Sequence, residues 1–307
     1  MSPPEATAGA RQAFGTIAAT PSTSSDPSFI TIPVPEFQGW AGSGPLPSIV
    51  ATEEIIRSAG PENIAAVITE PMFGAGSLMP HDRYHVELRE LSKKYGFLWI
   101  DDEVLTGFGR LGEWFGYQCF PGIEPDLMTV GKGINSCALP VGGVVASHEI
   151  AEYFDRARWW TGSTMEGHPL VCASTVGFLE AMIDEDTIGR VRQLGRHLVA
   201  GLRSLADRHP SVGHLHGRGP CYAVDLVNRA GEPIVPEDRS ALLLGDLSRH
   251  PNTIVARECA KRGVHLGGFV PNTIKVAPPF TVTEEEIDTA LAAFGEALTV
   301  IGEEFGG

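Results

Sequence analysis

Short apolar runs alternate with longer segments of helical spacing along the first part of the chain. Apolar positions recur at helical intervals in residues 48–58 and 81–95. Uninterrupted apolar runs of strand length occupy residues 64–69, 97–100, 127–130 and 141–146. Continuous apolar strands separated by helices predict an α/β fold with a mostly parallel sheet covered on both faces. Ligands of such sheets bind outside the carboxyl ends of the strands, so the polar residues that end each strand are the first candidates for a site.

The pattern changes character after about residue 169. We expect a long amphipathic helix from Pro169 through the 170s and a second helix over Thr187–Arg208. Beyond them, strand-like and helical segments are mixed, near residues 220–227, 251–262, 273–277 and 283–300. This mixture predicts a smaller C-terminal α/β domain beside the main sheet. We place the junction between residues 183 and 190, which gives a large domain over 1–185 and a small domain over 186–307.

Composition and charge narrow the class of protein. The 307 residues are 43% hydrophobic and carry a formal net charge of −15, which argues against a nucleic-acid or anionic-membrane surface. No apolar run reaches the length of a membrane span, and the N-terminus lacks the pattern of a secretory signal, so we expect a cytoplasmic protein. The five cysteines form no CxxC pair and are expected mostly in the core of a reduced protein. The histidines are scattered, and His214 and His216 lack further ligands, so no metal site is expected.

Two strand ends carry groups that suit chemistry. Residues 97–110 (FLWIDDEVLTGFGR) bring Asp101, Asp102 and Glu103 to the end of an apolar strand, ahead of a Gly-rich turn. Residues 124–134 (EPDLMTVGKGI) end another strand at Lys132, between two glycines that let the backbone approach a ligand. Taken singly, each would be a solvated strand end and an exposed loop lysine. Their pairing, one crossover apart, favours a shared site.

The pair has a definite chemical use. A lysine amine can form a Schiff base with an aldehyde coenzyme. Pyridoxal 5'-phosphate (PLP) acts as an electron sink when its ring nitrogen is protonated, and an adjacent carboxylate keeps the proton there. Lys132 and Asp102 at the ends of neighbouring strands satisfy both requirements.

Several ordered motifs make this interpretation specific. Residues 102–112 (DEVLTGFGRLG), 125–133 (PDLMTVGKG) and 139–143 (LPVGG) occur in the order and at the spacing of class III, or omega-amino, aminotransferases. The chain also resembles this family upstream and downstream, in residues 64–71 (IAAVITEP), 161–169 (TGSTMEGHP) and 277–279 (APP). The resemblance runs from about residue 60 to the C-terminus. It implies the PLP-dependent aminotransferase fold of type I, with a partial large domain, and it implies PLP as cofactor.

The resemblance also assigns roles to single residues. Lys132 would hold the coenzyme and move the proton, Asp102 would bind the pyridine nitrogen, and Val104 would pack on the ring. Thr164 matches a threonine that reaches the phosphate of the neighbouring subunit's coenzyme, which implies a homodimer with shared sites. Glu70 matches a glutamate near the substrate carboxylate. Arg110 follows the turn rather than the strand end, so we expect it to be structural.

Two departures from the family concern the amino donor. Leu105 stands where many members have a glutamine, and an aliphatic residue there resembles the branches that use amines, β-alanine or taurine with pyruvate. Lys275 occupies the position of an arginine that clamps the α-carboxylate in other branches, and a lysine offers a point charge rather than a bidentate fork. Alternatively, Lys275 is a solvated strand-end lysine. We therefore expect transfer of an amino group from an amine or omega-amino acid to a keto acid such as pyruvate.

A third departure concerns the start of the chain. In the family, a Gly/Ser-rich turn that opens a helix holds the coenzyme phosphate well upstream of the residues matched here. Gly42-Ser43-Gly44 has a suitable composition but is followed by Pro45 and lies in the wrong order, so we expect a turn. Two alternatives stay open: a truncated, catalytically impaired aminotransferase or a fragment that needs a separate N-terminal part, and an aminomutase of the glutamate-semialdehyde type.

Overall fold

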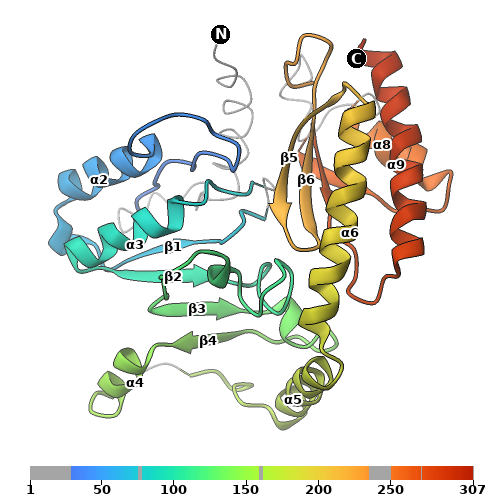
Figure 1. Cartoon of the computed structure of the whole chain (residues 1–307). Coiled ribbons are helices and arrows are strands. Elements are labelled where there is room, and N and C mark those ends of the chain that lie inside the picture. Colours follow the sequence, from blue (N-terminus) through green and yellow to red (C-terminus); the bar gives the residue numbers. More distant parts are fainter. Residues whose placement is uncertain (1–28, 75–77, 159–161, 235–249, 271, 307) are drawn as a thin grey trace.

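A four-stranded sheet forms the middle of the molecule, in the order β1-β2-β3-β4 (Figure 1). In the computed structural model, which describes residues 29–74, 78–158, 162–234, 250–270 and 272–306, its strands are β1 (Ala66–Thr69), β2 (Leu98–Asp102), β3 (Leu127–Val130) and β4 (Gly143–Ala146). The pairs β1–β2 and β2–β3 are parallel, and β3–β4 is antiparallel. The expected parallel sheet is confirmed for three strands, and the fourth is an antiparallel edge.

Helices α2 (Pro47–Ala59) and α3 (Tyr84–Tyr95) cover one side of this sheet (Figure 1). Helix α2 begins with a proline, whose fixed φ and missing N–H suit the first turn. Helix α3 ends at Gly96 in the left-handed conformation that favours glycine. The apolar faces of the two helices meet the start of β2 in one buried cluster, made of Leu46, Ile49, Ile56, Tyr84, Leu88, Leu91 and Phe97. Three short 3-10 turns, η1 (Pro61–Asn63), η2 (Gly116–Cys119) and η3 (Lys132–Ile134), complete this half.

A second sheet is antiparallel throughout, in the order β5-β6-β8-β7. Its strands are β5 (Val212–Arg218), β6 (Cys221–Leu226), β7 (Gly267–Val270) and β8 (Thr273–Val276). The helices of this half are α6 (Thr187–Arg208), α8 (Pro251–Ala260) and α9 (Glu284–Phe305), and their apolar faces share a core with β6 and β8. The expectation of a C-terminal unit with both strands and helices is confirmed, whereas β5, β7 and the antiparallel pairing were not predicted.

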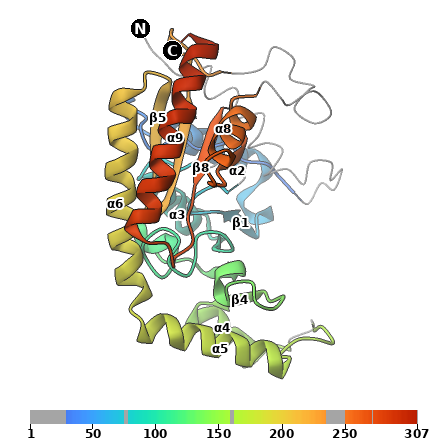
Figure 2. The same ribbon diagram turned by 90° about the vertical axis from the view of Figure 1, so that its right-hand side faces the viewer.

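Two helices lie below β4, at the lower edge of the view in Figure 1. Helix α4 (His148–Phe154) follows β4 and was not predicted, while α5 (Pro169–Asp184) lies where a helix was expected (Figure 2). The expectation that α5 is amphipathic is wrong, because apolar residues occur all round it and Met182 alone is buried. Apolar side chains on β4 and α5 are instead exposed, among them Val144, Val145, Leu170, Val176 and Ile183.

Two further expectations concern cysteines and membranes. All five cysteines are free thiols, but only Cys221 and Cys259 are buried, so the expectation that most lie in the core is wrong. Among the described residues, no helix combines the length and the apolar character needed to cross a bilayer.

Candidate active site

The carboxyl ends of three parallel strands bring Glu70, Asp102 and Lys132 to one edge of the first sheet. Strand β1 pairs Thr69 with Asp101 of β2, and β2 pairs Asp102 with Thr129 of β3. Glu70 therefore follows the last pair of β1, and Lys132 lies two residues after the end of β3. The charges of Asp102, Lys132 and Lys275 all act on the carboxyl of Glu70. Val104 belongs to the same group, because its backbone N–H donates to Asp102, so the structure brings together five of the six predicted site residues and leaves out Thr164.

Asp102 has one free carboxylate oxygen. Its Oδ1 accepts a hydrogen bond from the backbone N–H of Val104 at 3.0 Å, which fixes the rotamer of the side chain. Among the described residues, Oδ2 has no hydrogen-bond partner, and the side chain is half-buried. A half-buried carboxylate held at one oxygen and open at the other fits the protonated pyridine nitrogen of PLP.

Lys132 stands in a constrained turn. Its φ of 38° lies in the left-handed region that a residue with a side chain rarely adopts. Such strain persists only where the surroundings impose it, and it concentrates at functional sites. The surroundings are close: a Cβ on Gly133 would lie 3.2 Å from Cβ of Phe108 and 3.3 Å from the carbonyl oxygen of Gly107. A Cβ on Gly131 would lie 3.5 Å from Cγ1 of Val104, so Val104 packs beside the backbone that carries the lysine.

Glu70 and Lys275 meet through the backbone of Gly74. The Gly74 N–H donates to Oε2 of Glu70 at 2.9 Å, and Nζ of Lys275 donates to the Gly74 carbonyl at 2.6 Å. Burial, more than any neighbouring charge, raises the pKa of Glu70 and lowers the pKa of Lys275. Leu105 lies over the same glycine, because a Cβ on Gly74 would lie 2.8 Å from its Cδ2. Lys275 comes from β8, so the second sheet contributes to the site, and the lysine is half-buried rather than freely solvated.

Thr164 and Arg110 lie outside this group. Thr164 is exposed in the turn before α5, and the structure does not bring it to Lys132. Arg110 donates from Nη1 to the carbonyl of Pro278 at 2.8 Å, and its guanidinium carbon lies 4.5 Å from the ring centroid of Phe280. These contacts support the structural role expected for Arg110. Gly42-Ser43-Gly44 lies in the loop and bend before α2, as expected for a turn.

Sequence reasoning missed two features of this region. It did not foresee the Gly74 backbone as the link between Glu70 and Lys275, because a glycine carbonyl has no sequence signature. It also treated Asp101 as one more acid at the strand end, although β2 extends through Asp102 and Asp101 is fully buried. The alternation of side chains along a strand was the signal, since of two successive acids one must face inward.

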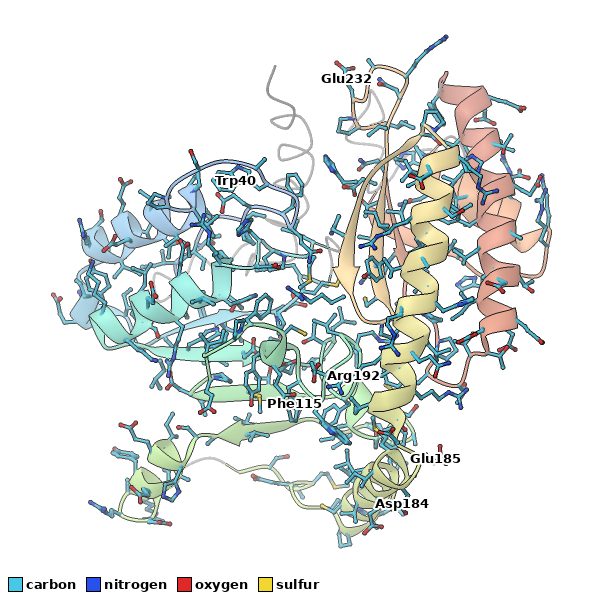
Figure 3. The ribbon with its side chains drawn as sticks, in the orientation of Figure 1. Trp40, Phe115, Asp184, Glu185, Arg192 and Glu232 are labelled. Atoms are coloured by element: carbon cyan, nitrogen blue, oxygen red, sulfur yellow. The ribbon has the colours of Figure 1, made fainter. Side chains whose placement is uncertain are left out.

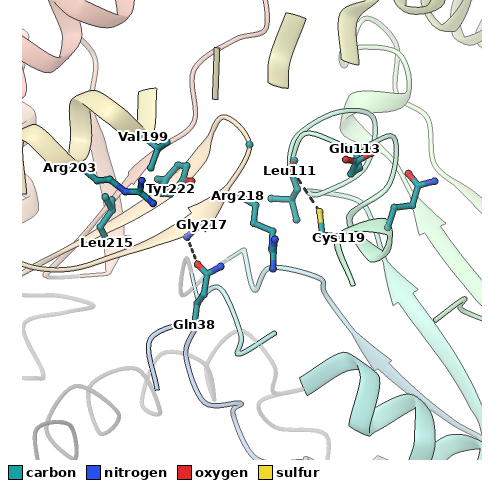
Figure 4. A pocket seen from close by; sticks show the side chains of 12 residues that line it. Gln38, Leu111, Glu113, Cys119, Val199, Arg203, Leu215, Gly217, Arg218 and Tyr222 are labelled. Atoms are coloured by element: carbon teal, nitrogen blue, oxygen red, sulfur yellow. Dashed lines mark hydrogen bonds between the residues drawn. The ribbon is translucent and has the colours of Figure 1, made fainter. Parts of the chain in front are cut away.

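A separate cleft of about 680 Å³ lies where α6 and the β5–β6 hairpin face residues 111–119 (Figure 4). Arg203, Arg218, Tyr222, Leu111 and Glu113 are among the residues that line it. Arg192 reaches from α6 to the same loop, where it donates to the carbonyl of Gly112 at 2.8 Å and pairs with Glu113 (Figure 3). None of the predicted site residues lines this cleft, so it is a junction between the two sheets and not the candidate site.

Comparison with known proteins identifies the family. The profile of the family Aminotransferase class-III matches residues 12–298. The chain is 33% identical over 252 residues to the probable gamma-aminobutyrate transaminase 4 of Oryza sativa subsp. japonica, covering 80% of this chain and 50% of the relative. It is 35% identical over 256 residues to the putrescine–pyruvate aminotransferase of Pseudomonas aeruginosa, covering 82% and 52%. The chain thus spans about half the length of these curated relatives.

Solved structures agree with this assignment. An S-selective transaminase from Arthrobacter sp. superposes with a TM-score of 0.82 at 38% identity, covering 86% of this chain and 58% of the other. Taurine:2-oxoglutarate aminotransferase from Bifidobacterium kashiwanohense, solved in complex with PLP and glutamate, superposes with a TM-score of 0.75 at 28% identity, covering 84% and 56%. The chain with its two strand ends at Asp102 and Lys132 belongs to the class III aminotransferases, a family of PLP-dependent enzymes.

Proposed function

We propose that this protein transfers an amino group from an amine or omega-amino acid to a keto acid such as pyruvate, with PLP as cofactor. The observation that carries the proposal is the placement of Asp102, with one open oxygen, on the strand adjacent to the one that leads to Lys132. When bound, PLP supplies the aldehyde that takes up the amino group and the ring that accepts electrons.

Three residues of the chain would hold the coenzyme and handle its protons. Nζ of Lys132 would hold the coenzyme and carry the proton between the two carbon positions of the reaction. Oδ2 of Asp102 would keep the proton on the ring nitrogen. The methyl groups of Val104, which pack beside Gly131, would cover one face of the ring.

The donor preference is supported by Leu105 and Lys275. Leu105 presents only methyl groups over Gly74, and the charge of Lys275 is committed to the Gly74 carbonyl at 2.6 Å. Neither residue offers the fork of donors that binds an α-carboxylate tightly. The name of the Pseudomonas relative, a putrescine–pyruvate enzyme, is consistent with a donor that has no α-carboxylate.

Absorbance and a donor panel test this proposal. The purified chain incubated with PLP should acquire the visible band of a lysine-bound coenzyme, and Lys132→Ala should abolish that band. Amines and omega-amino acids should then support pyruvate consumption better than ornithine does. A colourless wild-type protein contradicts PLP binding by this chain, and a preference for ornithine contradicts the donor class.

An alternative is a chain that needs a complementing N-terminal part. The span of about half the length of the relatives supports it. On this alternative, PLP should bind weakly to the chain alone, and a polypeptide equivalent to the preceding part of a relative should restore the band.

We further propose that the active species is a homodimer in which Thr164 reaches the coenzyme phosphate of the partner subunit. Thr164 is exposed, and it lies along the chain between β4 and α5, two elements that both expose apolar side chains. Both observations suit a surface that faces a second subunit.

A further inference from the structure

Asp101 is a buried acid on the side of β2 opposite to Asp102. Successive side chains of a strand point to opposite faces, so Asp101 shares its face with Trp99 and Glu103. Its exposed fraction is 0%, and among the described residues neither carboxylate oxygen receives a hydrogen bond. Burying an ionised carboxylate that accepts no hydrogen bond is strongly unfavourable, so the charged form of Asp101 is destabilised in the folded protein.

Among the described residues, no cation is one of the groups with the largest effect on Asp101. The groups that act on it most are Glu103, Asp102 and Glu70, all of them acids. From α3, the ring of His85 stacks on Trp99 at 5.9 Å between centroids, but burial lowers the pKa of His85 to about 4 and keeps it neutral. From η2, the phenol of Tyr117 also faces this acid. Burial therefore raises the pKa of Asp101 to about 10, with Glu103 as the second cause.

Glu103 differs from Asp101 in its partners. It is equally buried, but Oε2 accepts from the hydroxyl of Thr106 at 2.5 Å and Oε1 accepts from the backbone N–H of Tyr117 at 2.9 Å. Two donors of this kind stabilise an ionised carboxylate. Of these two neighbouring acids, Glu103 therefore has the hydrogen-bond donors that an ionised carboxylate needs. Asp101 has no such donor among the described residues, so a bound proton is what would satisfy its carboxyl group.

We propose that Asp101 is protonated in the folded protein at neutral pH and donates a hydrogen bond to the carboxylate of Glu103. The proton is taken up from solvent on folding, and no other bond changes. Glu103 then fixes the turn after β2 through Thr106 and Tyr117, and Asp102 projects from the strand just before that turn. Asp101 is thus a positioning residue for Asp102. That last link rests on the proposed role of Asp102, whereas the proton on Asp101 does not.

Stability as a function of pH tests the proton. A group whose folded pKa is raised above its unfolded value stabilises the fold fully at low pH and loses that contribution as pH rises toward the folded pKa. Asp101→Asn keeps a donor toward Glu103 but does not titrate. Between pH 5 and 9 the folding equilibrium constant of the wild type should therefore fall relative to Asp101→Asn by up to about tenfold per pH unit. The measurement is urea unfolding of the full chain without added coenzyme.

Glu54→Gln is the matched control, because it removes one acidic charge from an exposed position of α2. It should run parallel to the wild type over the same pH range. Parallel curves for Asp101→Asn and the wild type would overturn the proposal, whatever the absolute stability of the variant.

Infrared spectroscopy gives a second test that needs no stable variant. The wild type at neutral pH should show the carbonyl band of a protonated carboxylic acid, and the band should shift in Glu103→Gln because the acceptor changes from a carboxylate to an amide. A spectrum without that band at neutral pH would also overturn the proposal. Both tests use coenzyme-free protein, so a failure of PLP to bind Lys132 would count against the proposed function alone.

Discussion

Lys275 holds its charge in a half-buried position between the two sheets, bonded to a carbonyl rather than to an acid. Burial lowers its pKa, while Glu70 across Gly74 favours the charged form. If this ammonium also attracts the distal carboxylate of an omega-amino acid, Lys275→Met should raise KM for such donors at least about tenfold, the value of one charge-assisted hydrogen bond. KM for amines without a carboxylate should change little. Steady-state kinetics on both donor types check this, with Lys261→Met at the C-cap of α8 as control.

The same substitution separates the two interpretations of Lys275. An equal rise in KM for both donor types would show that the lysine holds Gly74 in place and does not bind the substrate carboxylate. An unchanged KM for both donor types would show that Lys275 has no role in substrate binding.

His85 gives the fold a dependence on acid pH. It is fully buried between Trp99 and Phe120, and burial lowers its pKa to about 4. The unfolded chain binds the proton near pH 6.5, so stability is lost as pH falls from about 6.5 to about 4, by roughly 3 kcal/mol in all. His85→Gln should remove this acid limb in urea unfolding at pH 4.5 and pH 7. The exposed His148→Gln should keep it.

At the scale of elements, the turn that carries Lys132 depends on a close approach of backbone segments. Gly133 lies against Phe108 and the Gly107 carbonyl, so Gly133→Ala must push η3 away from the turn after β2. The two turns carry the predicted coenzyme ligands Lys132 and Val104. We therefore expect Gly133→Ala to weaken PLP binding about tenfold or more, measured by titration of the visible band. Gly177→Ala in α5, where an added Cβ meets nothing within 4 Å, should leave PLP affinity unchanged.

The junction between α5 and α6 is also an element-scale feature. The first helix ends at Asp184, close to the bend seen in Figure 3, and the second begins at Thr187. Asp186 is the N-cap of the second helix and has a left-handed conformation. The proposed division into a partial large domain over 1–185 and a small domain over 186–307 falls in this bend. It stays a prediction, which limited proteolysis between the two helices would test.

At the scale of the whole molecule, the two sheets are joined by polar contacts from several directions. Arg218 pairs with Asp82 at 2.7 Å, Arg110 donates to Pro278, and Lys275 donates to Gly74. The candidate site also lies between the two sheets, because Glu70, Asp102 and Lys132 come from the first sheet and Lys275 comes from the second. Its geometry therefore depends on the relative position of the sheets.

The exposed apolar surface predicts self-association. Val144 on β4 is 66% exposed and Leu170 on α5 is 62% exposed, and further apolar side chains on both elements are exposed as well. That is more than single surface residues of a monomer explain. Sedimentation at micromolar concentration should show a dimer for the wild type, and the double variant Val144→Lys, Leu170→Lys should shift it toward monomer. Val50→Lys on α2 is the control. A wild-type monomer over the whole concentration range would contradict the homodimer.

Sequence alone determined the alternation of helices and strands that builds the parallel part of the first sheet, and the residues at its strand ends. Continuous apolar runs placed β1, β2 and β3 to within two residues. The expectation that the sheet is covered on both faces is wrong for the described residues, because Ile68 and Leu98 are exposed. The ordered motifs then tied Asp102 and Lys132 to one family, which the comparisons confirmed. The individual residue roles stay predictions.

Only the tertiary structure decided which strands pair, which distant residues meet and which side chains are buried. The antiparallel pairing of β4 and of the second sheet depends on partners distant in the chain, and the alternating polar strand β5 has no apolar run to reveal it. The meeting of Lys275 with Gly74 joins residues that lie far apart in the chain through a backbone carbonyl. Asp101 is buried although it is an acid, and α5 is largely exposed although it is apolar. Sequence suggests the opposite in both cases, because burial depends on what packs on an element and not on that element's own residues.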